Sequence, residues 1–183
     1  EKTWNVKLET KSVQIPSNYS EACGTNIPQW EEATERCVHD LEANEVGEWI
    51  ILVNFKGKTI SSRFVYQIKV RPDGTIEAFC RWTPRGYEEL AGEHFDPEKI
   101  FAATPQLGVF RFIVNKAIVL GYITFHLDFK RAFSHAPLKE QVCVRLPKGY
   151  RKYDKDGNEL ALLLHKSSEG LKQSAANWQE HLA

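Results

Sequence analysis

Two runs rich in β-branched and aromatic residues flank a four-residue turn, and this arrangement constrains the fold more than any other feature. The turn is Arg71-Pro72-Asp73-Gly74, in which proline presets one backbone dihedral angle and glycine tolerates a positive φ. The run 59–70 precedes the turn and the run 75–82 follows it. Such runs on both sides of a turn are typical of paired strands. The sequence therefore predicts a long antiparallel hairpin.

The charges are segregated along the chain, although the formal net charge is zero. Residues 1–50 hold four Lys and Arg against ten Asp and Glu, whereas residues 56–87 hold seven against two. The basic region coincides with the expected hairpin. A basic surface can attract a polyanion, but strands whose Lys and Arg side chains are simply solvated give the same pattern. Charge alone leaves both interpretations open.

Helical spacing of apolar residues appears in three other segments. The first helix, of about four turns, is expected after the start signal Asn26-Ile27-Pro28 and carries Trp30 on its apolar face. A second is expected over residues 107–120, with Gly121 at the position of a C-terminal cap, and a third over residues 174–182. These segments predict helices that pack against the hairpin.

The remaining apolar segments are short enough to be strands, and they are bounded by polar or turn residues. They cover residues 49–53, 122–127, 141–146 and 160–164. Residues 1–25 show little periodicity, and we expect a mostly extended lead-in segment there. Helices packed against hairpins, without alternating βαβ units, indicate an α+β fold.

Composition excludes several classes of protein. The chain has 183 residues, of which 42% are hydrophobic, which is enough for a packed core. It has neither a signal peptide nor an apolar run of the roughly 20 residues that a membrane span needs, so we expect an intracellular protein without membrane contact, in a cytoplasmic particle or the nucleus. The four cysteines are widely scattered and are expected to be reduced thiols. Because methionine is absent, we expect the sequence to begin inside a longer polyprotein or to be a processed piece.

Asp128 is the first candidate for chemistry, because it follows the expected strand 122–127 and so lies where a hard cation such as Mg²⁺ can bind. A single carboxylate does not make a metal site. From the local pattern, an aspartate that caps the next turn is the commoner explanation.

A longer motif around Asp128 strengthens the case for a functional role of this residue. Residues 127–144 read L-D-F-K-R-A-F-S-H-A-P-L-K-E-Q-V-C-V, followed by Pro147 and Gly149. This string resembles the signature of Ty1/copia-type reverse transcriptases. Further similar elements occur in the family's order, namely F-V-Y-Q-I-K at 64–69, D-G-T-I-E at 73–77, R-G-Y at 85–87 and H-K-S-S-E-G-L-K-Q-S at 165–174. Ordered matches over roughly residues 28–183 are more specific than any single motif.

The resemblance implies the fingers and the start of the palm of a right-hand polymerase, within a partial reverse-transcriptase domain over residues 26–183. The fingers would cover about 26–100 and 136–172, and the palm about 101–135 and 173–183. The family's second metal-binding motif, Tyr-x-Asp-Asp, is expected beyond Ala183. The chain alone is therefore expected to be inactive.

The resemblance also implies a two-metal nucleotidyl transfer with Mg²⁺. Asp128 would be the first catalytic metal ligand, and the backbone carbonyl of Phe129 would be a second ligand. Phe133 occupies the steric-gate position, where its ring would exclude a 2′-hydroxyl. Without the resemblance, Phe133 is better explained as a core aromatic residue.

Four further residues match positions around the incoming deoxynucleoside triphosphate. Lys69 and Arg81, on the two hairpin strands, would hold its phosphates, whereas Gln173 and Gly170 would lie beside the nucleotide. The alternatives are ordinary strand-surface charges, a loop glutamine and a turn glycine. The implied partners are an RNA or DNA primer-template, deoxynucleoside triphosphates, and the rest of the polyprotein with its remaining palm and RNase H.

Several positions depart from the family pattern. The lysine that usually precedes the Ala-Arg pair is missing before Arg81, Ser168-Glu169 replaces Leu-Tyr before Gly170, and Ala175-Ala176 replaces Pro-Arg. Glu169 would place a carboxylate near a pocket for a polyanion. The function expected first is thus part of a retroelement RNA-directed DNA polymerase. The alternatives are a degenerate, non-catalytic nucleic-acid-binding remnant and a structural or protein-interaction domain.

Overall fold

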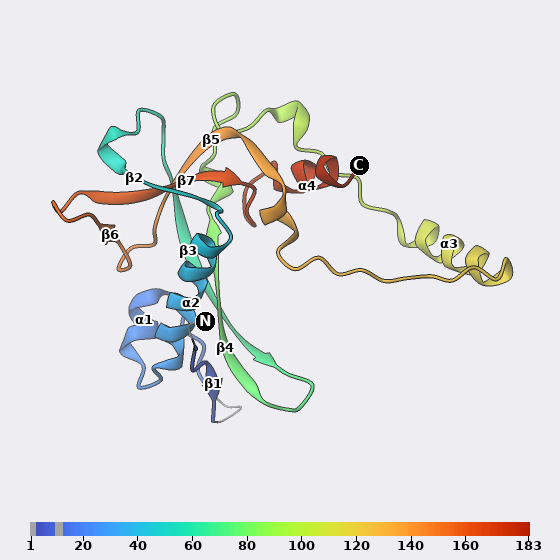
Figure 1. Cartoon of the computed structure of the whole chain (residues 1–183), viewed down its shortest axis with the longest axis horizontal. Coiled ribbons are helices and arrows are strands. Elements are labelled where there is room, and N and C mark those ends of the chain that lie inside the picture. Colours follow the sequence, from blue (N-terminus) through green and yellow to red (C-terminus); the bar gives the residue numbers. More distant parts are fainter. Residues whose placement is uncertain (1–2, 10–12) are drawn as a thin grey trace.

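The chain has an α+β fold, which confirms the class expected from the sequence (Figure 1). The computed structural model describes residues 3–9 and 13–183, and over these residues it contains one seven-stranded mixed sheet and four α-helices. The strands are β1 (Lys7–Leu8), β2 (Gly47–Ile51), β3 (Ile60–Val70), β4 (Ile76–Pro84), β5 (Pro137–Arg145), β6 (Lys152–Tyr153) and β7 (Glu159–Lys166). The helices are α1 (Tyr19–Gly24), α2 (Gln29–Ala43), α3 (Leu107–Val119) and α4 (Ser174–Leu182), together with the 3₁₀ turns η1 (Leu52–Asn54), η2 (Gly86–Glu88), η3 (Pro97–Lys99) and η4 (Ala132–His135).

The sheet has the order β1-β4-β3-β5-β7-β2, and β6 pairs with β7 beside this path. Neighbouring strands are antiparallel except β3 and β5, which run parallel over a short stretch. The strands expected at 49–53, 141–146 and 160–164 correspond to β2, β5 and β7. Helix α4 also lies where the sequence predicts it.

The predicted hairpin is confirmed as β3 and β4, which pair from Ser62 opposite Pro84 to Val70 opposite Ile76. The turn is closed by a hydrogen bond of 2.8 Å from the backbone N–H of Arg71 to the carbonyl oxygen of Thr75. Along β3, buried and more exposed side chains alternate, as expected for a strand with one face on the core. The turn end of the hairpin, where β1 pairs with β4, projects away from β5, β7 and β2 (Figure 1).

Helix α2 confirms the first predicted helix and covers one face of the hairpin. Its buried residues include Trp30 and Thr34, which recur at helical spacing. The indole of Trp30 packs edge-on against the ring of Tyr66 on β3, with ring centroids 5.7 Å apart. The hydroxyl groups of Thr34 and Tyr66 share a hydrogen bond of 2.9 Å. These contacts fix α2 over the hairpin.

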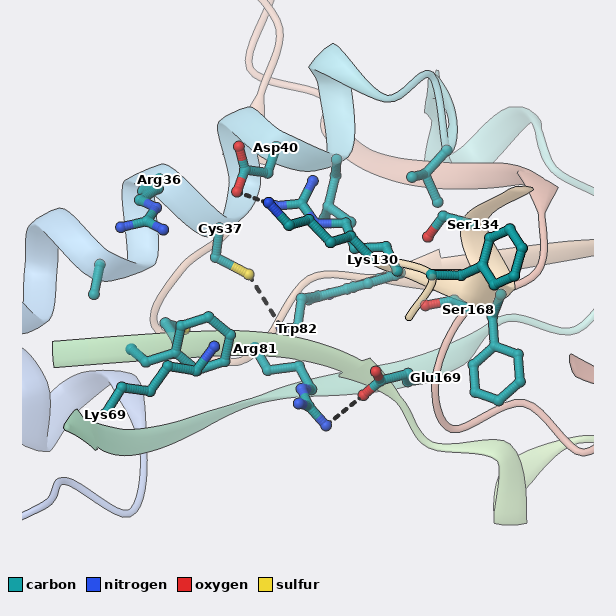
Figure 2. A pocket seen from close by; sticks show the side chains of 18 of the residues that line it. Arg36, Cys37, Asp40, Lys69, Arg81, Trp82, Lys130, Ser134, Ser168 and Glu169 are labelled. Atoms are coloured by element: carbon teal, nitrogen blue, oxygen red, sulfur yellow. Dashed lines mark hydrogen bonds and ion pairs between the residues drawn. The ribbon is translucent and has the colours of Figure 1, made fainter. Parts of the chain in front are cut away.

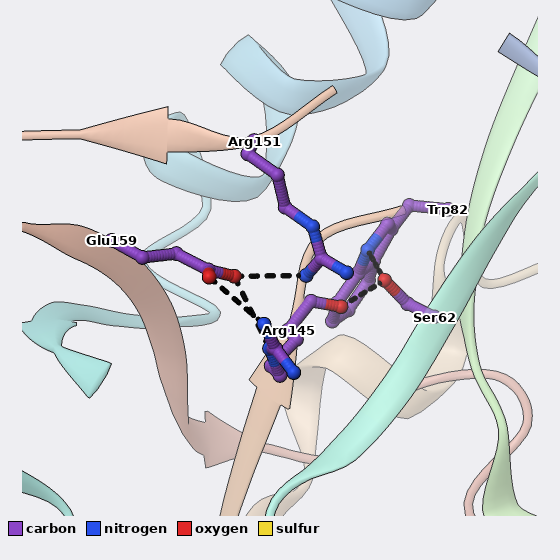
Figure 3. A network of polar contacts seen from close by, with 5 residues as sticks. All are labelled: Ser62, Trp82, Arg145, Arg151 and Glu159. Carbon is purple, nitrogen blue, oxygen red and sulfur yellow. Dashed lines mark hydrogen bonds and ion pairs between the residues drawn. The ribbon is translucent and has the colours of Figure 1, made fainter. Parts of the chain in front are cut away.

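A polar network fastens the hairpin to the other half of the sheet (Figure 3). The indole N–H of Trp82 donates to Ser62 Oγ at 2.8 Å, and the Ser62 hydroxyl donates to the carbonyl oxygen of Arg145 at 2.6 Å. The guanidinium of Arg145 donates two hydrogen bonds to Glu159 at 3.1 and 2.8 Å, and Arg151 lies 3.0 Å from the same carboxylate. The network therefore reinforces the short parallel pairing of β3 with β5.

The lead-in region is less extended than expected. Strand β1 pairs with β4, and residues 19–24 form the helix α1. The Asn18 side chain accepts a hydrogen bond of 3.0 Å from the backbone N–H of Glu21, and the Glu21 carboxylate accepts one of 2.7 Å from the backbone of Ser17. This reciprocal capping is a helix-start signal. Residues 1–2 and 10–12 of the expected lead-in lie outside the described residues.

Helix α3 confirms the second predicted helix, but the strand predicted at 122–127 is wrong. Gly121 ends α3 with a φ of +68°, as predicted for a C-terminal cap. Residues 122–128 then run extended and exposed, and within 3–9 and 13–183 no strand pairs with them. A β-rich sequence becomes a strand only where a neighbour accepts its hydrogen bonds. Figure 1 shows α3 standing away from the sheet, and most of its apolar side chains are exposed.

None of the described helices is both long enough and apolar enough to cross a lipid bilayer. All four cysteines are free thiols, in agreement with the sequence-based expectation.

Candidate functional site

A pocket of about 600 Å³ lies between α2, the β3–β4 hairpin and the segment 128–134 (Figure 2). Helix α2 contributes Arg36, Cys37 and Asp40 to its lining, and the loop before α4 contributes Ser168 and Glu169. Elements that are distant in sequence thus enclose one site. Its lining mixes basic, acidic and aromatic side chains, which suits a ligand that is both charged and partly flat.

Five of the seven residues that the sequence singled out line this pocket. They are Lys69 and Arg81 from the hairpin, and Asp128, Phe129 and Phe133 from the segment that follows α3. The hairpin register places Lys69 opposite Glu77 and Arg81 opposite Val65, so the two cations lie on the same face of the hairpin with Phe79 between them. The other two residues, Gly170 and Gln173, are not among those that line the pocket.

Lys69 lies in a crowded basic environment. Its ammonium nitrogen is 3.2 Å from the centroid of the Phe79 ring, which is a cation–π contact. Burial lowers the pKa of Lys69 below its usual value, and the nearby charges of Arg81 and Arg36 lower it further. An anion placed among these three side chains would relieve their mutual repulsion.

Arg81 is already engaged by an acidic residue of the pocket. Its Nη1 atom lies 2.6 Å from Glu169 Oε2, and both side chains are about half exposed, at 45% and 42%. Figure 2 shows the Glu169 carboxylate reaching Arg81 across the pocket wall. The carboxylate that the sequence placed near the pocket therefore contacts the residue that the resemblance assigns to phosphate binding.

The sequence did not identify the basic and acidic residues on the opposite wall. Arg131 has a left-handed backbone, with φ of +53°, and its guanidinium pairs with Asp40 of α2. Asp40 lies one helical turn after Arg36 and faces the same pocket. The spacing of four between Arg36 and Asp40 could have suggested a shared face, but nothing local indicated that Arg131 would reach it.

Asp128 is an exposed residue at the end of the unpaired segment 122–128. The next residue, Phe129, packs its ring edge-on against Trp178 of α4, with centroids 5.3 Å apart. Among residues 3–9 and 13–183, no three His, Cys, Asp or Glu side chains gather closely enough to hold a metal ion by themselves. Mg²⁺ commonly binds through one or two carboxylates together with phosphates and water. A Mg²⁺ ion at Asp128 would therefore need further ligands, such as phosphate oxygens.

Gly170 allows two backbones to approach closely. Its φ is +106°, and a Cβ built on it would lie 2.4 Å from the carbonyl oxygen of Pro84 at the end of β4. Its own carbonyl accepts a hydrogen bond of 3.1 Å from the N–H of Gly86, and a Cβ on Gly86 would lie 2.0 Å from that carbonyl oxygen. The two motif glycines thus lie against each other, and both shape the base of the hairpin.

Gln173 is buried and acts as an anchor between loops. Its Nε2 donates a hydrogen bond of 2.9 Å to the carbonyl oxygen of His94. The buried ring of His94 accepts from the N–H of Leu90 through Nδ1 at 2.9 Å, so its Nε2–H donates to the carbonyl oxygen of Lys58 at 2.7 Å. The Nε2 of Gln173 is therefore committed to a contact within the fold, whereas its buried Oε1 has no hydrogen-bond partner among the described residues.

Comparison with known proteins gives matches in sequence to a family model and to curated proteins. Residues 48–183 match the family model described as reverse transcriptase (RNA-dependent DNA polymerase). The chain is also 30% identical over 125 residues to the retrovirus-related Pol polyprotein from transposon TNT 1-94 of Nicotiana tabacum. That alignment covers 67% of this chain but only 9% of the tobacco polyprotein. No solved structure gives a significant match.

Proposed function

Because the chain belongs to the reverse transcriptase (RNA-dependent DNA polymerase) family, we propose that its pocket holds the triphosphate of an incoming deoxynucleotide. The parent protein would be the Pol polyprotein of a copia-type retroelement. In this proposal, residues 26–100 and 136–172 belong to the fingers of the polymerase, and residues 101–135 and 173–183 belong to the palm.

The observation that carries the proposal is the convergence of Lys69, Arg81, Asp128, Phe129 and Phe133 on one pocket of about 600 Å³. Pockets for small molecules and cofactors fall in roughly this range of volume. The resemblance gave these residues related roles, and the fold brings them together from three separate segments. Lys69 and Arg81 supply the positive charge that a triphosphate needs, and the fork of Arg81 suits phosphate oxygens.

The remaining roles concern the metal and the sugar. Reverse transcriptases generally use divalent metal ions, and Mg²⁺ bound here would offset the charge that develops on the phosphates. Asp128 and the carbonyl oxygen of Phe129 would hold such an ion together with the phosphates. Phe133 would lie beneath the sugar and exclude a 2′-hydroxyl. The whole polymerase activity, on a primer-template, belongs to the complete polyprotein.

The exposed apolar surface of α3 supports the proposal that the chain is part of a larger parent protein. Phe110, Phe112 and Ile113 are 58%, 66% and 59% exposed. Large apolar patches of this kind usually contact another protein surface. We assign this surface to contact with the remaining palm of the polyprotein.

A second candidate is a non-catalytic nucleic-acid-binding remnant, and one observation favours it. Glu169 pairs with Arg81 at 2.6 Å, so that a residue of the phosphate pocket is already partly neutralised. In that case the hairpin would bind the nucleic-acid backbone, and Asp128 would have no catalytic role.

The test is the binding of deoxythymidine triphosphate, measured by titration calorimetry with Mg²⁺ present. Arg81→Ala should weaken binding about 10- to 100-fold, because it removes charge-assisted hydrogen bonds. Arg63→Ala is the matched control, since Arg63 is an exposed residue of β3 that does not line the pocket. Equal affinity in the Arg81 and Arg63 variants would contradict the proposed site, and binding of single-stranded DNA without any triphosphate binding would favour the remnant.

A further inference from the structure

The contact between Arg81 and Glu169 occupies the place that an anionic ligand would take (Figure 2). Glu169 lies in the loop between β7 and α4, and Arg81 lies on β4. Both line the pocket, and their charged atoms are 2.6 Å apart. A phosphate bound by the same guanidinium would have to displace the carboxylate or share the guanidinium with it.

The same arrangement is repeated around the pocket. Arg131 pairs with Asp40, and Arg71 donates a hydrogen bond of 2.7 Å to Glu77. Three arginines that line the pocket therefore each have an acidic partner. The lining is basic in composition, but much of its charge is balanced internally. Of these acidic partners, Glu169 neutralises the arginine that the proposed function assigns to the phosphates.

We propose that Glu169 competes with the phosphates of the ligand for Arg81, so that a bound phosphate group must displace the Glu169 carboxylate. The inference rests on the proposed function, because it concerns the same pocket. A half-exposed ion pair is weak and can open at small cost. A triphosphate can replace the carboxylate at Arg81 and still contact the other cations. A monophosphate gains little beyond the contact that it displaces, so it binds poorly.

A purely structural role for Glu169 makes the opposite prediction. If the ion pair only tethers the loop to β4, neutralising Glu169 would loosen the pocket and weaken anion binding. If Glu169 competes with the ligand, neutralising it would free Arg81 and strengthen binding. The direction of the change in affinity therefore separates the two roles, and thermal unfolding reports any loss of the tether.

The experiment titrates the 183-residue chain with inorganic tripolyphosphate and with inorganic phosphate, in low-salt buffer without metal. Glu169→Gln should tighten tripolyphosphate binding about three- to tenfold, because it removes both a competitor and a repulsive charge. Phosphate binding should change in the same direction, because both ligands meet the same carboxylate at Arg81. The matched control is Glu180→Gln, which removes an equal charge from a surface pair with Lys139, 2.8 Å apart and outside the pocket.

A double-mutant cycle connects the effect to Arg81. In the Arg81→Ala background, Glu169→Gln should change tripolyphosphate affinity by about twofold or less, because the arginine that is competed for is absent. Unchanged or weaker binding in Glu169→Gln alone would overturn the inference while leaving the phosphate pocket intact. Failure of every variant to bind tripolyphosphate would instead overturn the proposed function.

Discussion

Replacing Gly170 with alanine should destabilise the fold far more than the same replacement at Gly157. Both glycines have a positive φ, of +106° and +83°, and a residue with a Cβ pays about 1–3 kcal/mol for such a conformation. The space around them differs. A Cβ on Gly157 meets nothing within 4 Å, whereas one on Gly170 would lie 2.4 Å from the Pro84 carbonyl oxygen and 2.7 Å from Thr83 Cγ2.

The additional cost at Gly170 comes from a backbone atom that cannot move without shifting β4. Forcing extra atoms into a packed site costs about 1–3 kcal/mol more. We therefore expect the free energy of unfolding to fall by about 3–5 kcal/mol in Gly170→Ala and by about 1–2 kcal/mol in Gly157→Ala. For a chain of this size, the first change lowers Tm by on the order of 10 °C. Urea unfolding followed by circular dichroism measures both, and equal losses would refute the close approach as the cause.

Three further predictions concern the polar network, the buried anchor and the hairpin. The hydrogen bonds from Arg145 hold the pKa of Glu159 below its usual value of 4.5, so Glu159→Gln should cost about 1–2 kcal/mol of unfolding free energy at pH 7. This difference between the variant and the wild type should fade below pH 4.5, because the stability that Glu159 contributes is lost as its carboxylate is protonated. A difference that does not depend on pH would argue against a contribution from the ionised carboxylate. Gln173→Leu should lower the unfolding free energy by about 1–3 kcal/mol while triphosphate affinity stays within about twofold, and a selective loss of affinity would instead place Gln173 in the site. Single-stranded DNA binding, measured by fluorescence anisotropy, should show a log–log salt slope of roughly −2 to −4, and Lys69→Ala with Arg81→Ala should flatten it by about one to two units; an unchanged slope would exclude the hairpin as the binding surface.

Local patterns predicted the elements whose stability depends on their own sequence. The hairpin was predictable because turn chemistry and alternating residues lie within one continuous segment. Helix α2 was predictable because its apolar residues recur at helical spacing. In α1, the signal Asn18-x-x-Glu21 was present in the sequence, but the surrounding Pro and Ser residues made the segment resemble a loop.

The strand at 122–127 could not be decided from its own residues, because a strand exists only through its partner. The pairing of Arg131 with Asp40 could not be predicted from the sequence either, since it depends on how the segment after α3 crosses α2. By contrast, the resemblance placed Lys69, Arg81 and Phe133 in one functional group on the evidence of the motifs alone, and all three line the pocket. Motif order carried information on tertiary proximity that periodicity did not.

The backbone contact at Gly170 explains why Glu169 reaches Arg81. Gly170 packs against Pro84 at the end of β4, and Glu169 is its immediate neighbour in sequence. Arg81 lies three residues before Pro84 on the same strand. The glycine contacts therefore place the carboxylate beside the guanidinium, and they join the same two segments as the ion pair. For this reason, neutralising Glu169 changes the charge of the pocket while its shape is maintained by Gly170 and Gly86, which makes the affinity for tripolyphosphate a direct measure of the competition.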